Sequence, residues 1–387
     1  MSGIISAIHF TISQGINQYE KVKNIAVMKK FRRFCFGGRQ RRYDMSRKKG
    51  GTVKTLGAAI LAASSAVGKK EKEGPLGDLF DFSDPTDRFG QKTWERSESE
   101  MQRIVFSGAA GKLGIGEEDI DAVFAGDLLN QCVGSAYGLL QFDIPYFGLY
   151  GACSTCAEGL TLAAMTVSAG LYRRAASVTS SHNASAERQY RNPLEYGGQR
   201  PPTAQWTVTG AGAFIVGKAC GDASALIADV MPGVVVEKGI KDAANMGAAM
   251  APAAADTVLR YLDENGKKPA DFDLIVTGDL GFEGNSILHD LLAVAGAETA
   301  RTGLLTDCGM MIFDRERQDV HSGGSGCGCS AAVLAAYLLP LLKSGMLKNI
   351  LFIGTGAMMS PSSTKQGEAI PAVAHLVHLT SPSGGSR

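Results

Sequence analysis

A ten-residue segment occurs twice in this chain, and the repeat limits the folds available to it. Residues 119–128 read DIDAVFAGDL and residues 271–280 read DFDLIVTGDL, with five of the ten positions identical. Each copy is a short apolar run after an acidic turn, which is typical of a buried strand. Each is later followed by a small-residue turn that contains cysteines, an apolar helical run and another strand. This order predicts an α/β protein with two duplicated halves, at residues 51–218 and 219–387.

The first 50 residues differ in charge from the rest of the chain. They hold 12 Lys and Arg against Glu20 and Asp44, a net charge of +10, whereas the remaining residues sum to −9. Their periodicity is weak, so we predict a basic, disordered extension. Contact with acidic lipid or nucleic acid, and a true start at Met28 or Met45, are alternative interpretations. The longest apolar run, residues 331–342, is too short to span a bilayer.

Residues 150–159 (YGACSTCAEG) form the cysteine-containing turn of the first half. We predict a buried strand at 144–149 before it and a helix at 160–172 after it. This places Cys153 at a helix N-terminus, where unpaired N–H groups and the helix dipole favour a thiolate or a bound anion. The alternative is a buried structural cysteine on a tight turn. No histidines stand at metal-ligand spacing from the Cys153/Cys156 and Cys327/Cys329 pairs, so we predict reduced thiols and no metal.

Apolar runs and helical spacing predict further elements along the chain. We expect strands at 56–67, 120–125, 175–180, 208–216, 349–354 and 370–379, and helices at 93–112 and 330–343. A long polar loop is expected at 181–206, between two core strands. Such a loop is more often functional than connective.

These landmarks resemble the thiolase superfamily, which includes the ketoacyl synthases. The matching segments are ILAASSAVG, YGACST, VTGAGAFIVG, HSGGSGCGCSAA and ILFIGTGA. The resemblance implies a thiolase-like five-layer αβαβα fold with two pseudo-equivalent sheets and two central helices. Within the superfamily, EGPLGDLFDF, AGDLLNQ, GLYGACST, GGSGCGCSA and the segment 179–213 resemble the stage V sporulation protein AD family of spore-forming bacteria. That closer resemblance covers roughly residues 58–380.

A thiolase-type reaction needs a base and oxyanion donors besides the cysteine. The resemblance implies that these groups come from two loops of the second half, here 277–279 and 323–329. The first loop carries Asp279 in place of His or Asn, and this acid would raise the pKa of Cys153 and repel an oxyanion. The second places Gly324 or Ser325 at the usual position. The changes favour a scaffold without catalytic activity over an acyltransferase with Cys153 as nucleophile and His321 as base.

The resemblance implies dipicolinic acid as the ligand, free or as its calcium chelate, and uptake of this compound into the developing spore. A planar pyridine dicarboxylate needs N–H donors, one or two cations and a flat apolar slot. The candidate ligand-binding residues are Cys153, Ser154, His182, Asn183, Arg188 (or Arg191), Thr203, Gln205, Asp127, Asp279 and Ser325. The two aspartates would be the oxygen ligands of calcium. Their alternative role is to cap turns; Arg188 would instead form an ion pair, and His182 and Asn183 would brace a loop.

Partners and location are also expectations from the resemblance. It implies association with other stage V sporulation membrane proteins, a position in the developing spore peripheral to its inner membrane, and otherwise the cytoplasm. By analogy with the superfamily we expect a homodimer, and we predict no nucleic-acid partner and no cofactor beyond chelated calcium. A structural subunit that docks on membrane partners, with a vestigial pocket, is the remaining alternative.

Overall fold

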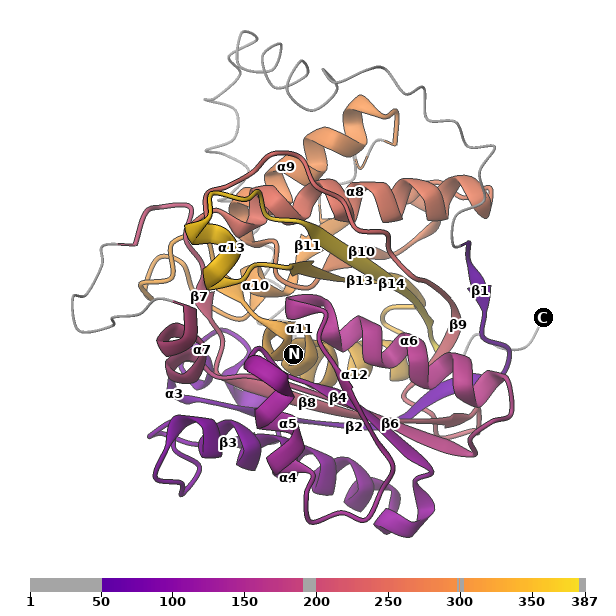
Figure 1. Cartoon of the computed structure of the whole chain (residues 1–387). Coiled ribbons are helices and arrows are strands. Elements are labelled where there is room, and N and C mark those ends of the chain that lie inside the picture. The colour runs from indigo at the N-terminus through magenta and orange to yellow at the C-terminus, as the bar shows by residue number, and fades with distance from the viewer. Residues whose placement is uncertain (1–50, 191–199, 298, 300–302, 383–387) are drawn as a thin grey trace, which may run out of the picture. The chain divides into compact units, whose positions relative to one another are not determined.

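Helices and strands alternate in five layers (Figure 1). The computed structural model describes residues 51–190, 200–297, 299 and 303–382, and residues 51–387 form one unit. Helices α8 and α9 cover the strands of the second half, α4 and α5 cover those of the first half, and α6, α11 and α12 lie between the two sets of strands. The αβαβα fold class is therefore confirmed. The predicted extension at 1–50 and the candidate Arg191 lie outside the described residues.

The two halves arrange their strands in the same order. Those of the first half are β2 (Ala58–Val67), β4 (Ala122–Gly126), β5 (Tyr146–Leu149), β6 (Arg174–Ser181) and β8 (Gly210–Lys218). Those of the second half are β9 (Ala225–Met231), β10 (Leu274–Thr277), β11 (Leu305–Asp307), β13 (Asn349–Ala357) and β14 (Ala372–Thr380). Numbered along each half, both sets lie in the spatial order 3-2-4-5-1.

Strand directions repeat as well as strand order. The second strand of each half, β4 or β10, runs parallel to both its neighbours. The fifth strand, β8 or β14, runs antiparallel to both of its neighbours. The sequence repeat leads into β4 in one half and β10 in the other, so the two copies occupy equivalent places. The expected boundary at 218/219 falls between β8 and β9.

A short pairing joins the two halves into a single sheet. Ala59 and Ile60 of β2 pair with Leu226 and Ala225 of β9. With the two-residue strands β1 (Val53–Lys54) and β3 (Phe82–Ser83), the described residues form a continuous sheet of 12 strands. A separate pair, β7 (Trp206–Thr207) with β12 (Gly324–Ser325), brings two distant loops side by side.

Long amphipathic helices cover the outer faces of the sheet. Helix α4 (Trp94–Leu113) begins where the Thr93 side chain accepts a hydrogen bond from the Arg96 N–H, and it ends at Gly114 in the left-handed conformation. It packs on β2 and β8, as α8 (Met246–Glu264) packs on β13 and β14. The remaining outer or short helices are α3 (Lys69–Lys72), α5 (Val133–Gly138), α7 (Asn183–Tyr190), α9 (Gly281–Val294), α10 (Cys308–Met311) and α13 (Pro361–Lys365).

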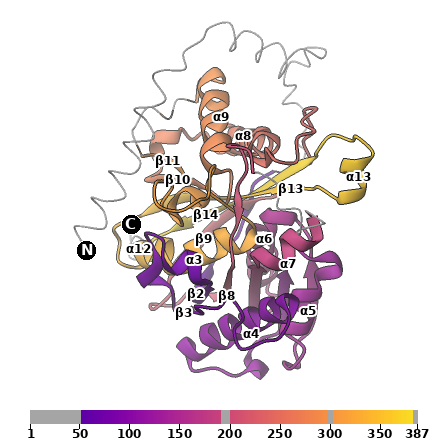
Figure 2. The same ribbon diagram turned by 90° about the vertical axis from the view of Figure 1, so that its left-hand side faces the viewer.

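The central helices follow the two cysteine-containing turns. Helix α6 (Thr155–Ser168) begins five residues before the predicted start, and the chain turns at Gly170 with a φ of 72°. Helix α11 (Cys327–Val333) is buried throughout and continues through a π-helical segment, Leu334–Leu338, into α12 (Leu339–Lys343). Helix α6 lies between the strands of the two halves (Figure 2) and contacts β4, β6 and β8 of the first half and β13 and β14 of the second. Burial of both helices explains why their sequences are rich in small apolar residues.

Two local predictions were wrong. The strand expected to be buried at 144–149 is β5, which pairs only with β4 among the described strands and lies at the sheet edge. Its side chains are therefore exposed, Tyr146 by 39% and Phe147 by 45%. The polar segment expected to be a loop at 181–206 contains α7, whose sequence from Ala184 to Gln189 holds good helix formers. No helix among the described residues is long and apolar enough to cross a membrane.

Close packing of β13 against the turn before α6 predicts a large effect of one added methyl group. A Cβ at Gly356 would lie 2.2 Å from the carbonyl oxygen of Gly151. We expect Gly356→Ala to lower the free energy of unfolding by about 1–3 kcal/mol, as overpacking does. Gly111→Ala, on an open face of α4 with nothing within 4 Å, should leave stability unchanged or raise it by about 0.5–1 kcal/mol. Urea unfolding of both variants measures this; equal stabilities would contradict it.

Candidate functional site

The turn that carries Cys153 is held by its own side chains. It is a 3₁₀ turn, Ala152–Ser154, between β5 and α6, and Ala152 has a φ of 49°. The Ser154 hydroxyl donates to the Gly151 carbonyl (2.7 Å), and the Thr155 hydroxyl donates to the Ala152 carbonyl (2.7 Å). A positive φ in a residue with a side chain is a strained conformation that the surroundings must impose. The predicted ligand-binding hydroxyl of Ser154 is thus used within the turn.

Residues from both halves meet beside the Cys153 thiol. Its sulfur lies 4.0 Å from the Ser325 hydroxyl, which donates to Asp279 Oδ2 (3.2 Å). The same oxygen accepts the Gly326 N–H (2.8 Å), and Oδ1 accepts the Thr355 hydroxyl (2.8 Å). The two second-half loops that the sequence analysis singled out therefore converge on the cysteine.

The Cys153 thiol is protonated at neutral pH. Burial raises its pKa well above the usual range, and the Asp279 carboxyl raises it further. Burial also raises the pKa of Asp279 itself. The prediction that the helix N-terminus would favour a thiolate is wrong, because loss of solvent and a neighbouring acid outweigh the helix dipole.

Helix α7 covers this thiol. Cys153 forms a small apolar cluster with Leu128, Ala186 and Cys327, and Tyr190 packs against it. The Tyr190 hydroxyl donates to the Leu128 carbonyl (2.9 Å) and contacts the Tyr150 hydroxyl. Cys153 is 5% exposed as a result. The sulfur is therefore almost closed off from solvent.

The histidine that would act as the base makes its contacts elsewhere. His321 Nδ1 lies 2.9 Å from the Pro201 carbonyl, and Nε2 lies 3.0 Å from Asp319 Oδ1. Both ring nitrogens are occupied by these oxygens, which leaves none to take a proton from Cys153.

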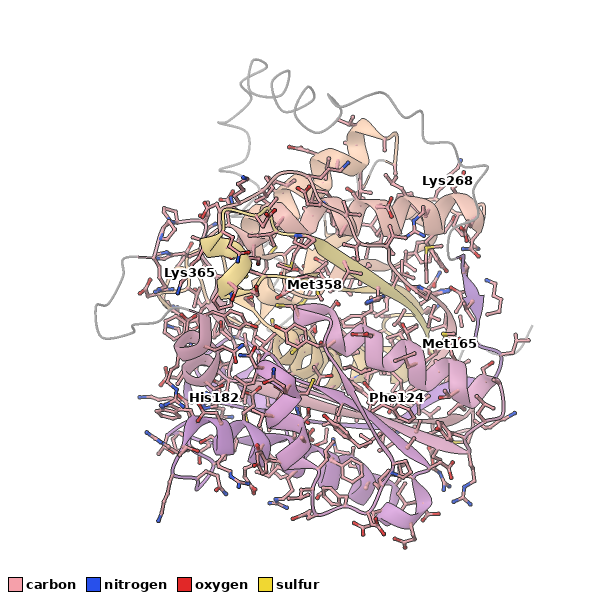
Figure 3. The ribbon with its side chains drawn as sticks, in the orientation of Figure 1. Phe124, Met165, His182, Lys268, Met358 and Lys365 are labelled. Atoms are coloured by element: carbon pink, nitrogen blue, oxygen red, sulfur yellow. The ribbon has the colours of Figure 1, made fainter. Side chains whose placement is uncertain are left out.

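The predicted loop residues His182, which is labelled in Figure 3, and Asn183 hold the start of α7 in place. His182 Nε2 lies 2.8 Å from the Asp87 carbonyl, and Nδ1 accepts the Ala184 N–H (3.2 Å). Burial lowers the pKa of this histidine, so it is neutral at pH 7. Asn183 donates to Thr209 and Thr207. Both contacts correspond to the bracing role that was the alternative to ligand binding.

The remaining predicted residues separate into three places. Gln205 Nε2 donates to the carbonyls of Asp279 (2.7 Å) and Gly324 (2.8 Å), so it ties together the two loops beside Cys153. Asp127 is buried and accepts the N–H groups of Leu129 and Ser135 together with the Ser135 hydroxyl, which is a turn cap. Thr203 is half-buried on the segment leading to β7.

Arg188 lines a cavity on the other side of α7. The cavity has a volume of about 410 Å³, and its walls come from α4, the loop before α5, and α7. Arg188 forms an ion pair with Glu95 of α4. Neither this cavity nor the buried Glu98 beneath it was predicted. One signal was available: Glu98 and Gln102 stand four apart on a helix whose neighbouring positions Met101 and Val105 are apolar and buried.

Metal binding has no support among the described residues. No group of three or more His, Cys, Asp or Glu side chains there could hold an ion. The thiols of both close cysteine pairs are free and buried. The two aspartates proposed as calcium ligands are separately hydrogen-bonded, Asp127 in its turn and Asp279 beside Cys153.

Sequence comparison decides the family. The model of the stage V sporulation protein AD (SpoVAD) family matches residues 52–380. The chain belongs to this family. It is 42% identical over 327 residues to stage V sporulation protein AD of Bacillus subtilis (strain 168), which covers 84% of this chain and 95% of that protein. The closer of the two resemblances found in the sequence is thereby confirmed.

Several solved structures share the fold of this chain at low sequence identity. OleA from Xanthomonas campestris aligns with a TM-score of 0.55 and 14% identity, over 84% of this chain and 99% of that one. The tetronic acid condensing enzyme AbyA1 gives a TM-score of 0.52 and 16% identity, over 84% and 99%. 3-Oxoacyl-[acyl-carrier-protein] synthase III from Aquifex aeolicus VF5 gives 0.50 and 13%, over 84% and 100%. At these identities the likeness concerns the fold alone.

The buried thiol predicts slow alkylation of Cys153. In the folded protein, iodoacetamide at neutral pH should modify the exposed Cys220 and leave Cys153 largely unreacted. Asp279→Asn removes one cause of the raised pKa and should speed modification of Cys153, by up to about tenfold for each unit by which the pKa falls. Peptide mass spectrometry measures both sites in one sample. Equal rates at Cys153 and Cys220 in the unaltered protein would contradict the assignment.

Proposed function

We propose that this protein is a non-catalytic thiolase-fold protein of sporulation that binds dipicolinic acid and supports its uptake into the developing spore. The observation that carries the first part is the state of Cys153, which is protonated, covered by α7 and next to an acid instead of a base. The ligand follows from the family resemblance. The same reasoning proposes contact with other stage V sporulation membrane proteins and a position peripheral to the inner spore membrane.

The chemistry of Cys153 argues against acyl transfer. A ketosynthase-type reaction needs a thiolate and donors aimed at the developing oxyanion. Here the carboxyl of Asp279 lies beside the thiol, and the contacts of His321 lead to Pro201 and Asp319. An anionic intermediate at this place would be repelled if Asp279 were ionised, and the raised pKa of the thiol opposes the first step in either case.

Calcium would enter with the ligand as its chelate. Because the described residues contain no cluster of three metal-binding side chains, a resident ion has no support. A chelated ion receives about three of its six to eight ligands from dipicolinate, and water or protein oxygens would fill the remaining positions. Calcium is therefore part of the cargo in this proposal.

Calorimetry and mass spectrometry together test the proposed function. We expect saturable heat on titration with dipicolinate and none with acetyl-CoA. We also expect no increase in the intact mass after incubation with acetyl-CoA, because Cys153 is not a nucleophile. A mass increase located at Cys153 would replace the proposal with the acyltransferase alternative. Absence of dipicolinate binding, with or without calcium, would favour the structural-subunit alternative.

We also propose a homodimer formed through β5. This strand is at the sheet edge, where unpaired backbone groups can pair with another strand. Exposed apolar side chains surround it: Tyr137, Leu140, Tyr146, Phe147 and Tyr150. A two-fold axis through β5 would extend the sheet across both subunits and bury this patch.

Charge placed on this patch should prevent dimer formation. Leu140 is 74% exposed, so Leu140→Asp should leave the fold intact and shift the protein from dimer to monomer. Val235→Asp is the matched control, because Val235 is 69% exposed and remote in sequence from β5. Its neighbour Val236 forms a bridge with Ala372 of β14. Light scattering on a size-exclusion column gives the mass of each. A monomeric unaltered protein would rule out this dimer.

A further inference from the structure

Two cations lie over the same half-buried tryptophan ring. Lys70 Nζ is 3.7 Å from the centre of the Trp206 ring, and Arg200 Cζ is 4.8 Å from it. Both cations donate to the Asp319 carbonyl, Lys70 at 3.2 Å and Arg200 at 3.1 Å. Arg200 also forms an ion pair with the Asp319 carboxylate, and His321 Nε2 lies 3.0 Å from its other oxygen. We call these five residues the Trp206 cluster.

The loop that carries Asp319 is held in place without its carboxylate. Gln318 Nε2 donates to the Lys70 carbonyl (2.7 Å), and Gln318 Oε1 accepts the Asp314 N–H (2.8 Å). The backbone carbonyl of Asp319 holds the loop to both cations as well. The Asp319 side chain is 71% exposed, whereas that of Arg200 is 17% exposed. The carboxylate can therefore leave the cluster while the loop stays where it is.

Positive charge is in excess in the Trp206 cluster. Burial and the Arg200 guanidinium lower the pKa of Lys70, although Asp319 and Glu73 act in the opposite direction. Glu71 lies nearby, but burial raises its pKa to about 8, so this acid is mostly protonated at neutral pH. A further anion beside the two cations would reduce the repulsion between them.

The guanidinium of Arg200 is only partly used. Nη2 binds Asp319, while Nη1 is buried and has no hydrogen-bond partner among the described residues. The two oxygens of the Asp319 carboxylate are divided, Oδ2 toward Arg200 and Oδ1 toward His321. A carboxylate that His321 did not hold could accept both arms of the guanidinium, which is the strong geometry for arginine. An acid supplied by another chain would have this freedom.

Two further aromatic rings beside the cluster each carry an arginine. Arg88 Cζ lies 3.4 Å from the centre of the Trp94 ring, and Arg315 Cζ lies 4.4 Å from that of Phe282. The three rings thus include both tryptophans of the chain. Tryptophan and arginine are enriched at the energetic centres of protein interfaces. Hydrogen bonds from the N–H of Lys69 to Asp87 and from the N–H of Phe282 to Ser322 connect these stacks to the cluster.

We propose that the Trp206 cluster and its two flanking cation–π stacks form a docking surface for an acidic segment of a partner protein, with a carboxylate of the partner replacing that of Asp319 beside Lys70 and Arg200. Asp319 is then an internal substitute that occupies the cluster while the partner is absent. The inference goes beyond the proposed function and does not depend on dipicolinate binding.

The surface fits an acidic protein segment better than an anionic lipid surface. Lipid surfaces are bound through exposed apolar side chains as well as through charge. None of the strongly exposed large apolar side chains of the described residues belongs to the cluster or its flanking stacks. Fixed arginines over aromatic rings suit carboxylates at defined positions.

Tryptophan fluorescence gives a local measurement of docking. Trp94→Phe keeps a ring beneath Arg88 and leaves Trp206 as the sole tryptophan of the full chain. Residues 1–50 hold 12 cations but no tryptophan, so peptide bound there is not seen directly. Titration with hexaglutamate peptide at about 50 mM salt should change the Trp206 emission and saturate, and higher salt should weaken the binding. Hexaglutamine peptide should cause no change.

Two pairs of variants with matched charge, made in this background, test the cluster. Arg200→Gln should weaken hexaglutamate binding by roughly ten- to a hundredfold, the effect of a lost charge-assisted pair. Arg317→Gln, at an arginine that is 87% exposed, should leave it unchanged. Asp319→Ala should strengthen binding by about two- to fivefold, the range of an exposed ion pair, because the competing carboxylate is gone. Glu316→Ala, at an exposed acid of the same loop, should not.

The results separate docking from general effects of charge. Equal weakening in Arg200→Gln and Arg317→Gln would overturn the assignment, as would unchanged Trp206 emission in the folded Asp319→Ala variant. Vesicles of phosphatidylglycerol replace the peptide in a second titration, and a response to the vesicles alone would overturn the choice of an acidic protein. Circular dichroism establishes that each variant is folded. If Arg200→Gln does not fold, Lys70→Gln removes the second cation and should weaken binding in the same way.

Discussion

One buried carboxyl group, that of Asp279, fixes the loops on which the centre of this structure depends. This carboxyl group accepts hydrogen bonds from Ser325, Gly326 and Thr355, and the backbone carbonyl of Asp279 accepts one from Gln205. A buried acid is tolerated only when such donors surround it. The arrangement leaves the Cys153 thiol next to an acid, so the feature that orders the loops also makes the cysteine unreactive.

The fold was predictable from the sequence because repetition carries information that single elements lack. The two copies at 119–128 and 271–280 indicated equivalent strands, and the structure gives both halves the order 3-2-4-5-1. Periodicity could not show which strand lies at an edge. Residues 146–149 are as apolar as a buried strand, yet β5 has a neighbour on one side only. Helix α7 was missed because its polar sequence has no apolar periodicity that would distinguish a helix from a loop.

Only part of the candidate site was within reach of the sequence. Cys153, Asp279 and Ser325 come together as the resemblance to the thiolase superfamily implied. His182, Asn183 and Asp127 looked like binding residues because they are polar and near core strands, but each is used in a hydrogen bond to the backbone. Position along the chain cannot distinguish a side chain that faces a cavity from one that braces a loop. On α7, for example, Ala186 and Tyr190 pack beside Cys153, whereas Arg188 lines the cavity on another face of the helix.

The distance along the chain between the parts of this centre has a consequence for biosynthesis. Cys153 and Ser325 are separated by 172 positions, and the last donor to Asp279 is Thr355. While the ribosome is still completing the second half, the turn at Cys153 lacks the carboxyl group and the helix α11 that later enclose it. Contacts of such long range form late and slowly. Before these contacts form, the Cys153 thiol lacks the neighbouring acid that helps to raise its pKa in the finished protein.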